Sequence, residues 1–127
     1  MDIGNPKDNC TCYEGYEGEP EIIIESENDA MQRLHIWEGY LDDLLREPKN
    51  DGNGWIGFTR DYHQCEGAFG ADSEAIITNL PEYLDDLKLY AGSAFEYAET
   101  RDVYNLLYSW LEDVIKAGCQ KITVKVV

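Results

Sequence analysis

The sequence predicts an α+β fold, in which a mostly antiparallel sheet of four to five strands packs against about three helices. Two patterns support this prediction: short runs of β-branched or alternating apolar residues, typical of strands, and longer stretches with an apolar residue every three or four positions, typical of helices. A length of 127 residues fits one small domain, and 43% hydrophobic and 12% aromatic residues argue against a disordered chain. We therefore expect a single domain over residues 1–127.

The N-terminal segment is expected to be loop-like, with a strand after it. Residues 1–20 are acidic and rich in Asn, Gly and Pro, which favour turns over regular packing. Residues 21–25 contain three consecutive isoleucines bounded by Pro20 and Ser26, a pattern typical of a buried strand. The well-packed part of the domain is therefore expected to begin with this strand.

A helix is predicted next, starting at a cap formed by Asn28 or Asp29. Its apolar residues fall at three- and four-residue steps, which places them on one side of a helix. Pro48 and the turn at residues 51–54 end the helix. The apolar stripe consists of Ala30, Leu34, Trp37, Leu41, Leu44 and Leu45.

A hairpin is predicted in the middle of the chain. Residues 55–62 include Trp, Ile, Phe, Thr and Tyr between glycine-rich turns, and residues 75–78 form a second short apolar run. A turn at residues 67–70 would join the two strands.

A short helix is predicted after this hairpin. Asn79 lies two residues before Pro81, and this arrangement is typical of the first turn of a helix, here at residues 81–90. A weak alternation of aromatic and polar residues at 95–97 indicates a short strand after it.

A long helix and a strand are predicted to end the chain. Thr100 is a suitable cap for a helix at residues 100–116, which has an apolar side and stops before Gly118. Residues 121–127 alternate Ile and Val with Lys and Thr, as a half-buried strand does.

Charge is the strongest functional signal in the sequence. The chain carries 26 acidic and 10 basic residues, a net charge of −16, and residues 1–47 contain 13 of the acidic but only three of the basic ones. Repulsion among these charges does not stabilise a fold, so the excess indicates solubility, salt adaptation or a basic partner. Nucleic acid and anionic membranes are excluded as direct partners, because both would repel this surface.

Location and metal content are expected from the same composition. No signal-peptide pattern is present and no apolar run approaches the about 20 residues that span a bilayer, so we expect a cytoplasmic protein with reduced cysteines. Cys10 and Cys12, together with His35, His63 and Cys65, lack the ligand spacing of common zinc sites. We therefore expect no metal and no other cofactor.

Two aspartate doublets stand in a repeated hexapeptide, Tyr-Leu-Asp-Asp-Leu followed by Leu or Lys. They are Asp42-Asp43 and Asp85-Asp86. Adjacent side chains on a helix point about 100° apart, so the two carboxylates of a doublet cannot easily converge on one reacting atom. The chain also lacks a nucleophile elbow, a Walker A loop and a dinucleotide-binding glycine loop, and no catalytic residue is predicted. The doublets are interpreted either as solvated helix surface or as acidic patches that meet Lys and Arg of a partner.

The three tryptophans are expected to differ in role. Trp37 and Trp110 lie on predicted apolar stripes, where core packing is the ordinary role of a tryptophan. Trp55 follows a glycine-rich turn at the start of a predicted strand, so it is either a core residue or a partly exposed anchor in an interface.

Several short groups of packing and turn residues stand out over residues 30–127. They are Trp37-Glu38, Tyr40-Leu41, Leu44-Leu45, Gly54-Trp55-x-Gly57-x-Thr59, Asp61-Tyr62, Gly67-x-Phe69 and Tyr83-Leu84-x-Asp86-Leu87. Together these groups resemble a family of bacterial contact-dependent growth inhibition immunity proteins, and they include no sharp functional motif.

The resemblance implies a small cytoplasmic α+β protein that binds the C-terminal toxin domain of a delivery protein and blocks it. Such toxins are commonly nucleases, whose basic clefts suit an acidic inhibitor that mimics phosphate. We therefore expect a non-enzymatic immunity protein, a monomer that forms a one-to-one complex with a basic toxin domain, a ribonuclease.

The resemblance does not identify individual contact residues, so these are predicted from charge and aromatic character alone. The charged contacts are Asp42, Asp43, Asp61, Glu66, Asp85 and Asp86, and the aromatic anchors are Trp55 and Tyr62. Two alternatives remain open: a small acidic adaptor or nucleic-acid mimic that occupies the basic groove of a housekeeping protein, and a metal-dependent hydrolase.

Overall fold

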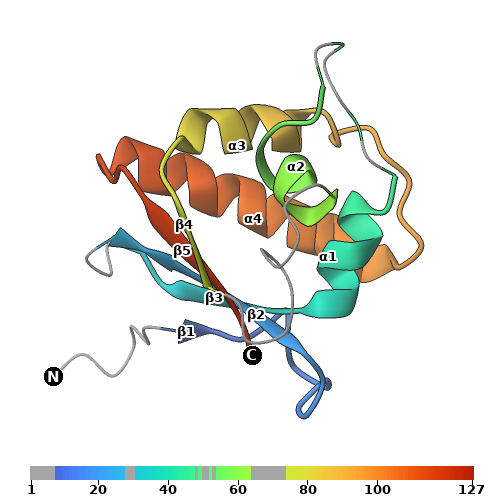
Figure 1. Ribbon diagram of the computed structural model, residues 1–127. Helices are drawn as coiled ribbons and strands as arrows, with labels where there is room; N and C mark the ends of the chain where they lie inside the picture. The colour runs from blue at the N-terminus through green and yellow to red at the C-terminus, as the bar shows by residue number, and fades with distance from the viewer. Residues whose placement is uncertain (1–7, 28–30, 48, 50–51, 53, 64–73) are drawn as a thin grey trace, which may run out of the picture.

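The computed structural model describes residues 8–27, 31–47, 49, 52, 54–63 and 74–127. Figure 1 shows one small α+β domain, with the helices gathered on one side of a five-stranded sheet. In chain order the elements are β1 (Asp8–Asn9), β2 (Glu21–Ser26), β3 (Arg33–Trp37), α1 (Glu38–Leu45), α2 (Gly57–His63), β4 (Glu74–Ile77), α3 (Leu80–Lys88), α4 (Ala98–Lys116) and β5 (Ile122–Val126).

The strands lie in the order β1-β3-β2-β5-β4. All neighbouring pairs are antiparallel except β1 with β3, which is parallel. Alternate residues of β2, β3 and β5 are buried, so one face of the sheet meets the helices and the other is partly open. Ile24, for example, pairs with both Leu34 and Val124, and all three side chains are buried.

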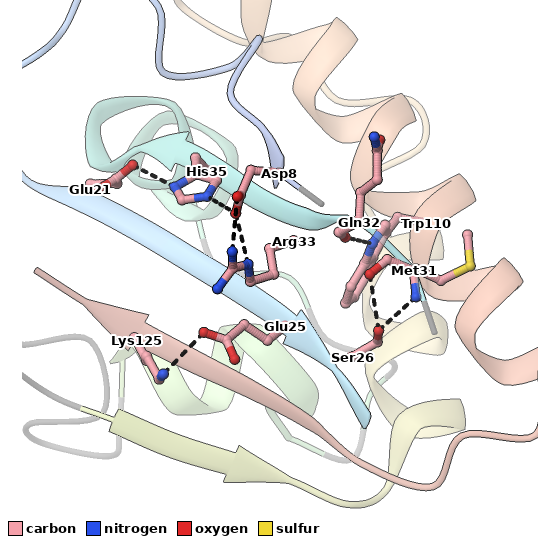
Figure 2. Close-up of polar contacts among 10 residues, drawn as sticks. All are labelled: Asp8, Glu21, Glu25, Ser26, Met31, Gln32, Arg33, His35, Trp110 and Lys125. Atoms are coloured by element: carbon pink, nitrogen blue, oxygen red, sulfur yellow. Dashed lines mark hydrogen bonds and ion pairs between the residues drawn. The ribbon is translucent and has the colours of Figure 1, made fainter. Parts of the chain in front are cut away.

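The core lies between this face of the sheet and the helices. Leu41, Leu87 and Leu107 come from three different helices and are completely or almost completely buried. Trp110 of α4 is also buried, and its indole N–H donates a hydrogen bond to the carbonyl oxygen of Gln32 at 2.7 Å (Figure 2). This confirms the predicted core role of Trp110.

The α+β class is confirmed, and so are the strands predicted at residues 21–25, 75–78 and 121–127, which correspond to β2, β4 and β5. The two helices predicted at residues 81–90 and 100–116 are α3 and α4.

Caps explain where these helices begin and end. Asn79 accepts a hydrogen bond from the amide of Glu82, and Gly118, with a φ of +86°, follows the end of α4. Thr100 is not the cap of α4, which starts at Ala98. Residues 95–97 form no strand.

The helix predicted between a cap at Asn28 or Asp29 and Pro48 was wrong in its first half; the cap residues and Pro48 themselves lie outside the described residues. Residues 33–37 form β3, and only Glu38–Leu45 is helical. In β3 the buried residues Leu34 and Ile36 alternate with polar neighbours, whereas Ile36 does not belong to the helical stripe. The three- and four-residue spacing of apolar residues favours a helix here, but pairing with β2 makes the segment a strand.

The predicted strand over residues 55–62 was also wrong, and with it the hairpin. Gly57–His63 is the helix α2, in which Phe58 and Thr59 are buried against α3. The aromatic and β-branched residues that favour a strand pack here on one side of a short helix. The turn predicted at residues 67–70 lies outside the described residues.

The acidic N-terminal segment packs more closely on the domain than its composition suggests. After β1, consecutive turns carry residues 10–20 back over the junction of β3 and α1, where Cys12 and Tyr16 lie against the core. The backbone amide of Trp37 donates to the carbonyl of Cys12 at 3.0 Å, and that of Glu38 to the carbonyl of Pro20 at 3.1 Å. Among the described helices, none is long and apolar enough to cross a membrane.

Candidate functional site

The two aspartate doublets have the same asymmetry in the structure. Asp42 and Asp85 are the first members, and their side chains are 47% and 63% exposed. Asp43 and Asp86 are the second members, and both are buried. Successive helical positions point in different directions, so one carboxylate of each doublet faces solvent and the other faces a neighbouring helix.

Asp43 holds the start of α4. Its carboxylate accepts hydrogen bonds from the amides of Glu96 and Tyr97, both at 2.9 Å, and from the Thr100 hydroxyl at 2.6 Å. Burial tends to raise the pKa of Asp43, but the hydrogen bonds from Thr100, Tyr97 and Glu96, with the charge of Arg46, outweigh it and hold the pKa below its ordinary value. The prediction that Asp43 is an exposed partner contact does not agree with this structure, because its carboxylate is used inside the fold.

Asp86 holds the start of α2. Its carboxylate accepts the amide of Thr59 at 2.9 Å and the Thr59 hydroxyl at 2.8 Å, and the Tyr90 hydroxyl lies 2.7 Å from that of Thr59. Burial raises the pKa of Asp86 to about 6, although the hydrogen bonds from Thr59 act in the opposite direction. Asp86 is therefore also corrected from a partner contact to an internal acceptor.

Three predicted contact residues do come together, on a surface that we call the α1–α2 patch: Asp42, Trp55, Tyr62 and the neighbouring His63. The Tyr62 hydroxyl donates to the carboxylate of Asp42, and the Trp55 and His63 rings lie 5.4 Å apart. A ring nitrogen of His63 is 2.6 Å from the carbonyl oxygen of Leu45, which fixes α2 against the end of α1. Trp55 and Tyr62 are half-buried, so the α1–α2 patch presents aromatic surface beside a carboxylate.

The other predicted contacts lie elsewhere. Asp61 is half-buried on α2 and accepts hydrogen bonds from the Tyr83 hydroxyl and, at 3.4 Å, from Arg60. Asp85 is exposed on α3, with the Lys88 ammonium 3.5 Å away. Glu66 lies outside the described residues.

A charged network on the open face of the sheet was missed by the sequence analysis. Figure 2 shows His35 of β3 between two carboxylates: its ring nitrogens lie 2.7 Å from Glu21 and 2.7 Å from Asp8, and Asp8 also pairs with Arg33 at 2.7 Å. The hydrogen bonds from His35 and Arg33 lower the pKa of Asp8. The signal in the sequence was the alternation of Arg33 and His35 with apolar residues, which places both on the same face of a strand.

The charges on this face neutralise one another to a large extent. Besides the network around His35, Lys125 of β5 lies 3.0 Å from Glu25 of β2 (Figure 2). Acidic and basic residues alternate across adjacent strands here, so much of the charge on the open face is paired.

An aromatic cluster was also missed. The rings of Tyr16 and Trp37 are stacked, with centroids 4.0 Å apart and planes 4° from parallel, and Tyr40 meets both rings edge-on. Tyr97, which is 38% exposed, lies 5.8 Å from Trp37. Trp37 packs against the core as predicted, but it is only half-buried and lies at the end of a strand.

The described part of the chain contains no group of three or more His, Cys, Asp or Glu side chains placed to hold a metal ion. Cys10, Cys12 and Cys119 are free thiols, and Cys65 lies outside the described residues. Burial is the main cause that raises the pKa of the Cys10 and Cys12 thiols, with a contribution from nearby carboxylates, so neither is activated as a nucleophile.

Comparisons with protein-family models, with curated proteins and with solved structures found no match for this chain.

Proposed function

We propose that this chain is an immunity protein of a contact-dependent growth inhibition system. It binds the basic C-terminal domain of a cognate toxin, a ribonuclease, in a one-to-one complex in the cytoplasm. It acts by binding alone and carries out no reaction of its own. The proposal combines the family resemblance in the sequence with the charge and surface geometry described above.

The observation that carries the proposal is the distribution of charge. Each of the four arginines is already bound to acceptors of the protein itself. Three pair with carboxylates: Arg33 with Asp8, Arg46 with Asp42 and Glu96, and Arg60 with Asp61 and Glu82. Arg101 donates to the backbone carbonyls of Ala91 and Ser93. Their positive charge is thus used within the fold, while the net charge of the chain is −16. A surface with this excess attracts a basic partner over a long distance and repels nucleic acid.

The α1–α2 patch is suited to the short-range part of such a complex. Trp55 and Tyr62 offer half-buried aromatic surface, which is enriched among residues that contribute most to binding energy. Asp42 lies beside them and is bound to Tyr62 and Arg46, so its position is fixed before a partner arrives. Asp85 adds an exposed carboxylate on α3, whereas the carboxylate of Asp61 is mostly buried beside Tyr83 and Arg60. Asp43 and Asp86 take no part in contact and keep the helices in place.

Inhibition would follow from occupation of the toxin's basic cleft. A nuclease binds the phosphates of its substrate through Lys and Arg, and carboxylates placed on a rigid helix can occupy the same groups. Long-range attraction would speed the encounter, and aromatic contacts would slow dissociation.

The test is calorimetric titration against the toxin domain encoded beside this gene, at two salt concentrations. We expect one-to-one binding at nanomolar affinity, about −12 kcal/mol, that weakens as salt rises. Absence of binding to that domain would contradict the proposal, and capture of a housekeeping protein through a basic groove would favour the adaptor function in its place.

A pair of charge reversals locates the contact. Asp42→Lys should lower the association rate constant several-fold, because it reverses a charge inside the proposed interface. Asp113→Lys makes the same change at an exposed position of α4 and is the matched control. Asp43 is unsuitable for this test, since its replacement would disturb the start of α4. Equal effects of the two reversals would show that net charge alone matters and that the α1–α2 patch is not the contact.

A further inference from the structure

A second surface on the molecule combines a partly exposed cluster of aromatic rings with acidic residues around it. We define the aromatic face as Tyr16, Trp37, Tyr40 and Tyr97, which come from the N-terminal turns, β3, α1 and the residue before α4. We propose that the aromatic face binds arginine or lysine side chains of a protein partner through cation–π contacts. The inference rests on the proposed function for the identity of that partner and adds a second contact surface to it.

The aromatic face is rigid. Tyr16 is stacked on Trp37, and the hydroxyl of Tyr40 donates to that of Tyr16 at 3.4 Å. The turns that carry Tyr16 are held by their own hydrogen bonds, including one of 2.6 Å from the Tyr13 hydroxyl to the carbonyl of Glu19. Rings that are already in place lose little conformational entropy when a ligand arrives.

Gly39 makes this arrangement possible. A β-carbon at Gly39 would lie 2.4–2.6 Å from three atoms of the six-membered ring of Trp37, so the indole rests directly against the backbone of α1. Glycine within a helix costs about 1 kcal/mol relative to alanine. The close approach of the indole is the structural reason for a glycine at this position.

The aromatic face remains partly accessible. Tyr97 is 38% exposed, Tyr16 and Trp37 are half-buried, and only Tyr40 is buried. The π faces of aromatic rings carry negative partial charge and attract ammonium and guanidinium groups that approach within about 6 Å of the ring centre. Because Tyr16 and the backbone at Gly39 cover the faces of Trp37, the rings that a cation can approach are Tyr97 and Tyr16.

The rim of the aromatic face is acidic. The three segments that form it, residues 10–20, 37–43 and 95–100, contain no Lys or Arg of their own, and Arg46 at the end of α1 pairs with Asp42 and Glu96 at one side of it. Glu14, Glu17 and Glu19 are exposed on the N-terminal turns, and Glu99 is exposed in the first turn of α4.

The charge of this rim reaches the groups beneath it. Burial and the hydrogen bond with Tyr16 raise the pKa of Tyr40, and the charge of Glu99 adds to this shift. Asp102, one turn further along α4, adds in the same way to the effect of burial, which raises the pKa of Cys12. A cation that approaches these rings would therefore find carboxylates nearby as well as aromatic surface.

The test uses the three tryptophan indole N–H resonances in nitrogen-15 spectra, each of which reports on a different place. Trp37 reports on the aromatic face, Trp55 on the α1–α2 patch and Trp110 on the core. The probe is acetylated hexa-arginine amide, titrated at low and at moderate salt. We expect the Trp37 resonance to move in a saturable way while that of Trp110 stays in place. A Trp37 resonance that does not move would overturn the inference.

Variants of Tyr97 test the ring contact. Tyr97→Ala should weaken the binding seen at Trp37 by two- to fivefold, the effect of about 0.5–1 kcal/mol expected from an exposed cation–π contact. Tyr97→Phe keeps the ring and should retain binding. Ile76→Ala removes an exposed apolar side chain from β4 and is the matched control. Equal weakening by Tyr97→Ala and Ile76→Ala would count against the aromatic face.

Variants of the rim and of Gly39 test the rest of the arrangement. Replacing Glu17 and Glu99 with Gln should weaken binding more than the pair Glu74→Gln and Asp113→Asn, which changes the net charge equally at distant exposed positions. Gly39→Ala, which is compatible with a helix, should displace the indole and weaken binding without unfolding the domain. Equal effects of the two charge pairs would mean that only net charge is recognised, which overturns the inference.

These outcomes are separable from those of the proposed function. A toxin domain that binds the wild type and Tyr97→Ala equally well would leave the immunity function standing and remove the aromatic face from the interface. Absence of toxin binding, with the peptide still bound at Trp37, would contradict the immunity function and leave the aromatic face as a site for basic side chains.

Discussion

Replacing Asp43 with Ala tests the internal role that the structure gives to this carboxylate. The change removes three hydrogen bonds, from the amides of Glu96 and Tyr97 and from the hydroxyl of Thr100, which is completely buried. Hydrogen bonds to a charged group contribute about 1.5–3 kcal/mol, and a buried hydroxyl left without a partner costs about 1–3 kcal/mol. Because these terms overlap, we expect the free energy of unfolding to fall by about 3–5 kcal/mol, a large part of the about 5–15 kcal/mol typical of a domain.

The assay is urea denaturation followed by circular dichroism, with Asp42→Ala as the matched control from the same doublet. The control removes an exposed carboxylate and should cost less than about 1 kcal/mol. The lowered pKa of Asp43 also predicts how stability depends on pH. The stabilisation of the folded state by Asp43 is present above the unfolded-state pKa of about 3.9 and is lost as the pH falls through the folded-state pKa. The gap between wild type and Asp43→Ala should therefore narrow in acid. If the two alanine variants differed by less than about 1 kcal/mol at pH 7, the reasoning would be refuted.

Three further predictions concern stability and local order. Because burial raises the pKa of Asp86 to about 6, the folded state keeps a proton that the unfolded state has lost between about pH 4 and 6. The unfolding free energy should therefore fall by up to about 3 kcal/mol as the pH rises from about 4 to 6.5. Asp86→Asn should abolish this dependence of the unfolding free energy on pH, as measured by urea titrations. Gly57→Ala should destabilise the domain more than Gly118→Ala in thermal melts, because both have positive φ but only at Gly57 would a β-carbon meet another atom, 2.9 Å away. His35→Ala should speed amide hydrogen exchange in β1, because His35 links Asp8 to β2; unchanged exchange there would show that backbone pairing alone holds β1.

Most of the fold could be predicted from local patterns. The strands β2 and β5 combine β-branched residues with a clear boundary or a clear alternation, and α3 and α4 combine an apolar side with a cap or a glycine stop. These signals agree with one another within each element. Agreement among independent local preferences is what makes a segment predictable from its sequence.

Two segments could not be predicted because their contacts are distant in the sequence. Leu34 and Trp37 fit the spacing of the following helix, and only pairing with β2 makes the segment a strand. Residues 57–63 have strand-like composition, and the acceptor that holds the start of α2 belongs to Asp86, 27 positions beyond Thr59. Tertiary contacts outweigh local propensity in both places.

The structure brings some of the predicted contact residues near one another. Tyr62 is hydrogen-bonded to Asp42, and Trp55 lies against His63, the residue after Tyr62, although the strand predicted for Trp55 and Tyr62 was wrong. The two doublets look uniform in the sequence, but burial separates Asp43 and Asp86 from their neighbours. That separation depends on which helix lies opposite, and one sequence does not contain this information.

The dependence of α2 on Asp86 also links recognition to folding. A helix of seven residues is too short to persist in water by itself, so α2 depends on its contacts with the rest of the fold, among them the acceptor that α3 supplies at its start. Trp55 and Tyr62 therefore present their rings only in molecules whose helical layer is assembled. A partner that binds these rings selects that population and, by mass action, protects the whole domain against unfolding and proteolysis.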